Sequence, residues 1–154
     1  MMRETVNHPD HYTAGGIEVL TVIHRYGLDF DLGNAVKYLL RADFKGNRLD
    51  DLRKARFYIA SWAERFSNDE VEEPCADEGT LVWAEPDRIA DAKGLTGDVR
   101  EAALAVLEVA VFIYEDFTTI EQMRLALLSL DAEIARMSGL GVIGAVPSDL
   151  GESA

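Results

Sequence analysis

The sequence predicts an all-α protein, with a small helical unit in its first half and an antiparallel helical hairpin in its second. Two observations lead to this expectation. Apolar residues recur at steps of three and four along most of the 154-residue chain, which is the helical period, and hydrophobic residues make up 48% of it, enough to bury a core. Convincing strand alternation is absent from the first 66 residues.

Three helices are expected in the first half. The first lies between Gly16 and Gly27, the second runs from Asp31 or Gly33 to about Ala42, and the third runs from Leu49 to Phe66. The first helix is predicted to bury one stripe, made of Ile17, Leu20, Ile23 and His24. We therefore expect His24 to be a core histidine. The third helix is predicted to bury Leu52, Ala55, Ile59, Ala63 and Phe66.

The second half contains a possible short strand, 80–83, and a brief helix after Pro86. Two long helices follow, from 98 to 115 and from about 118 onward, and Thr118 with Glu121 is predicted to form a capping box. Apolar residues in the last helix form a heptad seam: Ile120, Met123, Leu127, Leu130, Ile134 and Met137. The short joint between the two helices predicts an antiparallel hairpin, whose apolar surface would serve assembly into a homo-oligomer.

Charge divides the chain in the same way. Residues 1–66 carry ten Lys and Arg against nine Asp and Glu, whereas residues 67–154 carry five against nineteen, within a net charge of −13. Any anionic ligand should therefore bind in the first half. We predict a nucleotide-handling helical unit over 1–66, an acidic linker over 67–79, an assembly or regulatory hairpin over 80–138 and a flexible tail over 139–154.

Several classes of protein are excluded or disfavoured. The strongly acidic composition argues against a nucleic-acid partner, and the single cysteine, Cys75, excludes an internal disulfide and a cysteine zinc cluster. No stretch is long and apolar enough to span a membrane, and no signal peptide opens the chain, so we expect a cytoplasmic protein. The motifs of P-loop kinases, Rossmann enzymes, nucleophile-elbow hydrolases and zincins are absent.

The second helix presents the residues most suited to binding an anion. Asn34, Lys37, Tyr38 and Arg41 fall within a sector of about 100°, opposite Ala35, Val36, Leu39 and Leu40. Lys45 and Lys54 are expected to extend the cationic surface. Two cations at this spacing can straddle a phosphate group, and each contact near 4 Å is worth on the order of 4 kcal/mol before desolvation. A solvated amphipathic helix is the alternative interpretation of the same pattern.

A second polar group lies ahead of the first helix. His8 and His11, with Asp10 between them, have the residue types of a divalent-metal site, but no further histidine clusters with them. We expect these imidazoles instead to donate to a phosphate oxygen or a base edge, and we predict no metal site made by the protein.

The ordered series Val6-Asn7-His8-Pro9-Asp10-His11-Tyr12, Gly16-Ile17-Glu18, Gly33 to Arg41, Lys45-Gly46 and Asp51 to Tyr58 resembles a small phage domain family, often labelled SaV-like. That family includes the P-loop-less nucleotide kinase of the T-seven group of podoviruses. The resemblance covers about residues 5–66. It implies an oligomeric phage protein that acts on deoxynucleoside monophosphates with Mg²⁺ and a triphosphate donor, in the host cytoplasm. The recurrent polar positions of the family are here His8, His11, Tyr12, Asn34, Lys37, Tyr38, Arg41, Lys45, Lys54 and Tyr58.

These observations together predict a deoxynucleoside monophosphate kinase-like phosphotransferase. Lys37 and Arg41 would neutralise phosphate charge, the other recurrent positions would bind substrate, and Mg²⁺ would arrive with the nucleotide. Three alternatives stay open: a phage protein that sequesters a nucleotide without turnover, an all-α nucleotide pyrophosphatase, and an interaction protein whose acidic half engages a basic host partner. A pyrophosphatase needs paired carboxylate motifs, and only Asp98 with Glu101 has the spacing of one.

Overall fold

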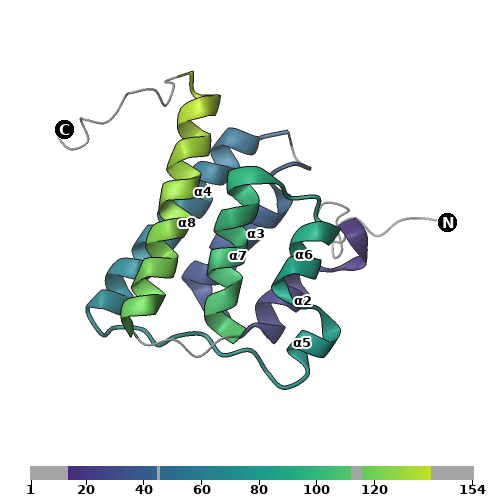
Figure 1. Ribbon diagram of the computed structural model, residues 1–154, viewed down its shortest axis with the longest axis vertical. Helices are drawn as coiled ribbons and strands as arrows, with labels where there is room; N and C mark the ends of the chain where they lie inside the picture. Colours follow the sequence, from purple (N-terminus) through teal and green to yellow (C-terminus); the bar gives the residue numbers. More distant parts are fainter. Residues whose placement is uncertain (1–13, 45, 112–115, 140–154) are drawn as a thin grey trace.

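Every regular element in the described part of the chain is helical, which confirms the predicted all-α class (Figure 1). The computed structural model describes residues 14–44, 46–111 and 116–139. The elements in chain order are η1 (Ala14–Gly16), α2 (Val19–Arg25), α3 (Phe30–Arg41), α4 (Arg48–Ser67), α5 (Thr80–Trp83), α6 (Pro86–Ala92), α7 (Gly97–Val111) and α8 (Asp116–Met137).

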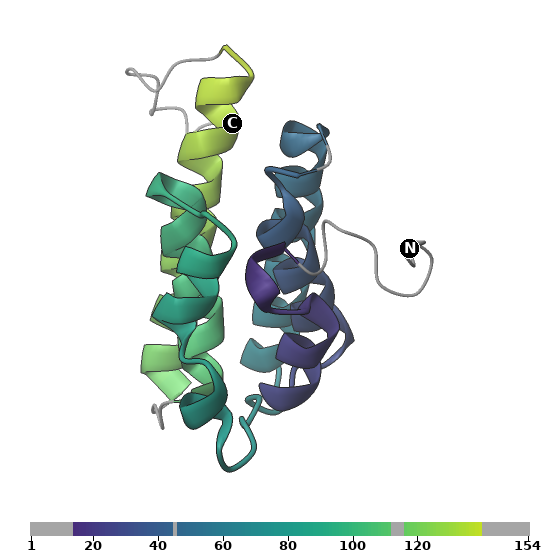
Figure 2. The ribbon, with the colours of Figure 1, turned by 90° about the vertical axis from the view of Figure 1, so that its right-hand side faces the viewer.

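The helices form two layers, which Figure 2 shows edge-on. One layer contains α2, α3 and α4, and the other contains α6, α7 and α8. The layers meet where α3 packs on α7 and α4 packs on α8. Leu39, Ile59, Val106 and Leu130 are all fully buried in one hydrophobic core to which both layers contribute. The first and second halves of the sequence therefore share that core.

The helices of the first layer form close to where the sequence predicts them. Helix α3 begins at Phe30 because Asp29 is its N-cap: the Asp29 carboxylate accepts a hydrogen bond from the Leu32 amide at 3.0 Å. The start predicted at Asp31 or Gly33 is thus late by at least one residue. Helix α4 buries three residues of its predicted stripe, Leu52, Ala55 and Ile59, while Ala63 and Phe66 are partly buried at its far end.

The predicted buried stripe of the first helix is wrong in part. Helix α2 buries Val19 and Val22, with Tyr26 directly after it, whereas Leu20 and His24 are exposed. The buried face of α2 therefore differs from the predicted one, and Tyr26 accounts for the difference. Tyr26 is fully buried and donates its hydroxyl proton to the carbonyl of Ala84 at 2.8 Å. A buried tyrosine needs such a partner, and this one lies in the other layer. His24 is therefore a surface residue and is not part of the core.

Residues 80–83, predicted as a short strand, form one helical turn instead. The amide of Ala84 donates to the carbonyl of Thr80 at 2.8 Å, which closes the turn. Thr80 is buried, and its hydroxyl oxygen lies 3.0 Å from the carbonyl oxygen of Arg25. The apolar residues that suggested a strand, Leu81 and Val82, are exposed.

Helices α7 and α8 run antiparallel, side by side, as the hairpin prediction expects (Figure 1). The capping box is wrong, because α8 already includes Thr118. Met123 and Leu130 of the heptad seam are fully buried, and α8 packs on both α4 and α7, so the seam is used within the chain. Among the described residues, no helix combines the length and apolarity needed to cross a bilayer.

The predicted linker, 67–79, has no helix after Ser67 and connects the two layers along one end of the molecule (Figures 1 and 2). Its backbone is bonded to both of them: the amide of Ala76 donates to the carbonyl of Ala110 at 2.8 Å, and the amide of Asp77 donates to that of Arg25 at 2.9 Å. These bonds attach the acidic segment to the helices at its two sides.

Candidate functional site

Helix α3 has the two-sided character that its sequence predicts. Ala35, Val36, Leu39 and Leu40 are completely buried, whereas Asn34, Lys37, Tyr38 and Arg41 keep partial exposure on the opposite side. The apolar side holds the helix against α4 and α7 and so fixes the direction in which the polar side faces.

Three cations gather around the ring of Tyr38. Lys37 Nζ lies 4.7 Å from the ring centroid, the Arg41 guanidinium carbon lies 4.8 Å from it, and Lys54 Nζ lies 5.3 Å from it. The ring of Tyr58 lies parallel to that of Tyr38, with 7° between the planes and 6.2 Å between the centroids. We call Lys37, Tyr38, Arg41, Lys54 and Tyr58 the tyrosine–cation cluster. The cluster joins α3 to α4, because each helix contributes one tyrosine ring and at least one cation.

Two carboxylates from the start of α4 balance part of this charge. Arg41 Nη2 lies 3.3 Å from Asp51 Oδ1, and the side chains of this pair are 14% and 1% exposed. Lys54 Nζ lies 3.2 Å from Asp50 Oδ2 at the surface, and its hydrogen bond to Asp50 raises the pKa of the Lys54 ammonium. Lys37 forms no ion pair with any described residue. Among the residues that the structure describes, no carboxylate therefore neutralises the Lys37 ammonium.

A groove of about 390 Å³ adjoins the cluster between the end of α2 and the start of α3. Its lining residues come from both helices and from the turn between them: Ile23, His24, Leu28, Asp29, Phe30, Gly33, Asn34 and Lys37. Gly33 permits this close approach of helices, because a Cβ there would lie 3.2 Å from Cγ2 of Ile23. The volume falls within the range of ordinary small-molecule sites.

Asn34 is oriented within this groove by its own helix. Its side-chain nitrogen donates to the carbonyl of Phe30 at 2.9 Å, so its side-chain oxygen is the group that remains to accept a hydrogen bond. The groove thus combines an apolar wall and a hydrogen-bond acceptor, and Lys37, whose ammonium lies over the ring of Tyr38, contributes to its lining.

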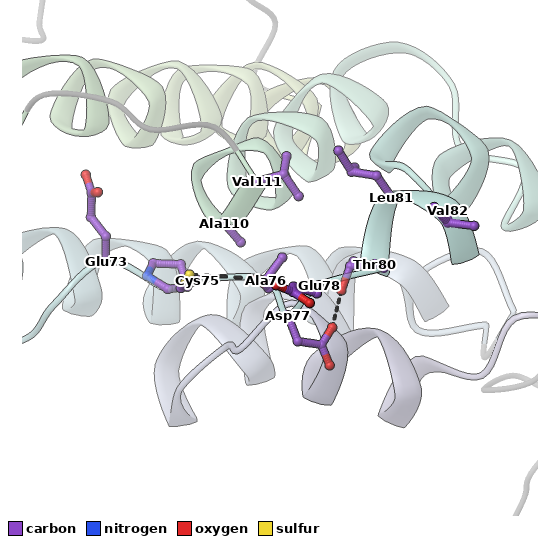
Figure 3. Close-up of a pocket in the computed structure, with 12 residues that line it drawn as sticks. Glu73, Cys75, Ala76, Asp77, Glu78, Thr80, Leu81, Val82, Ala110 and Val111 are labelled. Carbon is purple, nitrogen blue, oxygen red and sulfur yellow. Dashed lines mark hydrogen bonds between the residues drawn. The ribbon is translucent and has the colours of Figure 1, made fainter.

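A larger hollow of about 500 Å³ lies beside the acidic segment, and Figure 3 shows its lining. It is bordered by Glu73, Asp77 and Glu78, with Ala110 and Val111 at one side, and its lining includes no lysine or arginine of the described residues. Asp77 turns away from Val111 and accepts a hydrogen bond from the Thr80 hydroxyl (Figure 3). A hollow with this charge repels phosphate, so the groove at α3 is the better candidate for an anionic ligand.

The structure brings together five of the predicted site residues, which form the tyrosine–cation cluster, and places Asn34 in the adjoining groove. His8, His11, Tyr12 and Lys45 lie outside the described residues. Asp98, the candidate pyrophosphatase carboxylate, pairs with Arg136 at 2.7 Å. Across 14–44, 46–111 and 116–139, no group of three or more His, Cys, Asp or Glu residues is arranged to hold a metal ion.

Three exposed side chains near the site were not predicted as site residues: Phe30 and Phe57, which the sequence did not single out, and His24, which was expected in the core. A helical wheel of α4 does contain a signal for Phe57, which projects about 160° away from the buried Ala55–Ile59 stripe. The sequence contains no such signal for Phe30, because the exposure of Phe30 depends on Asp29 being the N-cap of α3.

Comparison with known proteins adds one match. Residues 6–60 match the model of a protein family of unknown function (DUF3310). The matched segment spans α2, α3 and most of α4, and so contains every residue of the tyrosine–cation cluster. No curated protein and no solved structure matches the chain.

Proposed function

We propose that the tyrosine–cation cluster binds the phosphate group of a deoxynucleoside monophosphate. The observation that carries the proposal is the convergence of Lys37, Arg41 and Lys54 on one ring. Like charges placed around one ring repel one another, and an anion among them would relieve that repulsion. Arg41 is suited to a planar, bidentate contact, while the two lysines supply compact charges that can adjust to the phosphate.

The activity we propose is transfer of the γ-phosphoryl group of a nucleoside triphosphate to the monophosphate. A phosphate oxygen of the acceptor would attack the γ-phosphorus, and the bond to the β-phosphate oxygen would break, so that two nucleoside diphosphates result. Such a reaction needs charge neutralisation and alignment more than covalent catalysis, and Lys37 and Arg41 would supply part of that neutralisation. Mg²⁺ would enter as a complex with the triphosphate, held by its oxygens.

Product analysis tests the proposal. The full chain is incubated with each of the four deoxynucleoside monophosphates, ATP and Mg²⁺, and the nucleotides are separated by chromatography. We expect a deoxynucleoside diphosphate and ADP to form in equal amounts, and Lys37→Gln to reduce their formation. Arg124→Gln is the matched control, since it removes one exposed positive charge on the remote helix α8. Saturable nucleotide binding without products would instead indicate a sequestering protein, and absence of both would contradict the proposal.

A further inference from the structure

Phe30 is 73% exposed at the first position of α3, although it is a large apolar side chain beside a well-packed core. Its ring contacts Tyr58 edge-on, with 5.9 Å between the centroids and 81° between the planes. The ring thus extends the stacked tyrosines of the cluster toward the groove that Phe30 itself lines. Its exposed surface is available to a planar ligand.

The groove has an aromatic residue, Phe30, at one end and a cationic residue, Lys37, at the other. Phe30, Asn34 and Lys37 follow one another along the groove on successive turns of α3. Seven residues of helix separate the aromatic end from the cationic end by about 10 Å. The ligand that this arrangement fits is flat and apolar at one end and anionic at the other.

The middle of the groove supplies hydrogen bonding. The side-chain oxygen of Asn34 is left as an acceptor, because its nitrogen donates to the carbonyl of Phe30. The exposed imidazole of His24 lines the opposite wall from α2. An acceptor and an imidazole beside an aromatic ring are groups that bind the polar edge of a nucleobase.

We propose that this groove is the base subsite of the nucleotide site, with the base stacked on Phe30 and its polar edge toward Asn34 and His24. The inference rests on the proposed phosphate binding at the tyrosine–cation cluster and adds that the ligand must carry an aromatic base. Phe30 is the stacking residue, and Lys37 stands where the base subsite meets the phosphate subsite.

Phe57 provides a matched control for Phe30. It is a phenylalanine with similar exposure, 65%, and it also contacts Tyr58 edge-on, with centroids 5.2 Å apart, but it does not line the groove. Replacing either phenylalanine by alanine removes a phenyl ring that contacts Tyr58. Only Phe30→Ala removes a wall of the groove.

The experiment compares the affinities of the full chain for a deoxynucleoside monophosphate and for 2-deoxyribose 5-phosphate, which lacks the base, by isothermal titration calorimetry. Loss of a stacking partner is expected to weaken nucleotide binding about fivefold or more in Phe30→Ala. Binding of the sugar phosphate should not change, and Phe57→Ala should bind both ligands as the wild type does. Circular dichroism confirms that each variant keeps its helices.

A second variant gives a direct readout. Phe30→Trp keeps an aromatic ring, so we expect it to retain nucleotide affinity, and its added indole fluorescence should be quenched by the nucleotide and not by the sugar phosphate. The inference is overturned if Phe30→Ala binds the nucleotide normally, if it weakens both ligands equally, or if Phe57→Ala has the same effect. In those cases loss of binding in Lys37→Gln would still support the phosphate site. A wild-type chain that binds neither ligand contradicts both proposals.

Discussion

Arg41 and Asp51 form an ion pair across the α3–α4 interface, with 3.3 Å between Nη2 and Oδ1. The Asp51 side chain is 1% exposed, and its second oxygen is buried without a hydrogen bond. A carboxylate so placed is costly to bury, and its attraction to the Arg41 guanidinium offsets part of that cost. The pair therefore holds Arg41 beside the ring of Tyr38.

Asp51→Ala should lower the free energy of unfolding by about 3 kcal/mol, because it leaves the largely buried Arg41 guanidinium without this carboxylate. Urea unfolding followed by circular dichroism measures the change. Asp50→Ala is the control, since it removes the neighbouring carboxylate from an exposed pair with Lys54, and its unfolding midpoint should match that of the wild type. Equal stability of the two variants would show that the buried pair does not support the helix interface.

Tyr38→Leu should weaken phosphate binding severalfold, whereas Tyr38→Phe should preserve it. The face of the ring attracts the three cations, and each such contact is worth about 0.5–1 kcal/mol at a partly exposed site. Phenylalanine keeps the ring face and loses only the hydroxyl. Titration with inorganic phosphate, followed by calorimetry, distinguishes the variants, and equal affinities in both would show that the ring does not organise the cations.

The buried Lys93 side chain should make the stability of the folded protein depend on pH. Its side chain is almost completely buried and donates to the carbonyl of Ile17, and burial lowers the pKa of the ammonium to about 8, against the opposing effect of Glu18. Between pH 8 and the ordinary lysine value the unfolded chain binds more protons than the folded chain, so stability rises with pH across this interval. Below pH 8 both states are protonated, and the burial penalty is fully present.

Comparison with Lys93→Met isolates this contribution from other titrating groups. The difference in unfolding free energy, wild type minus variant, should increase between pH 8 and about 10.5, because only the wild type relieves a burial penalty by losing a proton. A difference that stays constant over that range would contradict the assignment.

Asp29 links the start of α3 to α4. One carboxylate oxygen accepts from the Leu32 amide, and the other accepts from Nε1 of the buried Trp62, each at 3.0 Å. Asp29→Ala should cost about 2–4 kcal/mol, from loss of the cap and of a partner for the indole N–H. Asp29→Ser restores a cap but is too short to reach both groups, so it should recover about 1 kcal/mol of that loss in urea unfolding.

The sequence predicted most of what periodicity controls. The division of α3 into a buried side with Ala35 and Leu39 and a polar side with Lys37 and Arg41 was correct, because a twelve-residue helix with this pattern has one stable way to pack. The antiparallel pairing of α7 and α8 was also correct, since a short joint leaves little choice.

The periodicity of apolar residues in the sequence could not predict contacts between elements that are distant along the chain. The exposure of His24 follows from Tyr26, whose hydroxyl bonds to Ala84 in the other layer, and that bond connects residues 58 positions apart. The exposure of Phe30 depends on which aspartate caps α3, and its sequence offers both Asp29 and Asp31. Asp31 is instead buried against α4, where Arg65 and Ser61 donate to its carboxylate.

The most direct test of the phosphate site is calorimetric titration of Lys37→Gln,Lys54→Gln with a deoxynucleoside monophosphate, beside Arg53→Gln,Arg124→Gln, which loses the same charge at exposed positions on α4 and α8. If the tyrosine–cation cluster holds the phosphate, the lysine variant should lose about tenfold or more in affinity, since each charged hydrogen bond contributes measurably, and the arginine variant should bind as the wild type does. Unchanged affinity in the lysine variant, with its helices intact, would contradict the assignment of this cluster as the phosphate site.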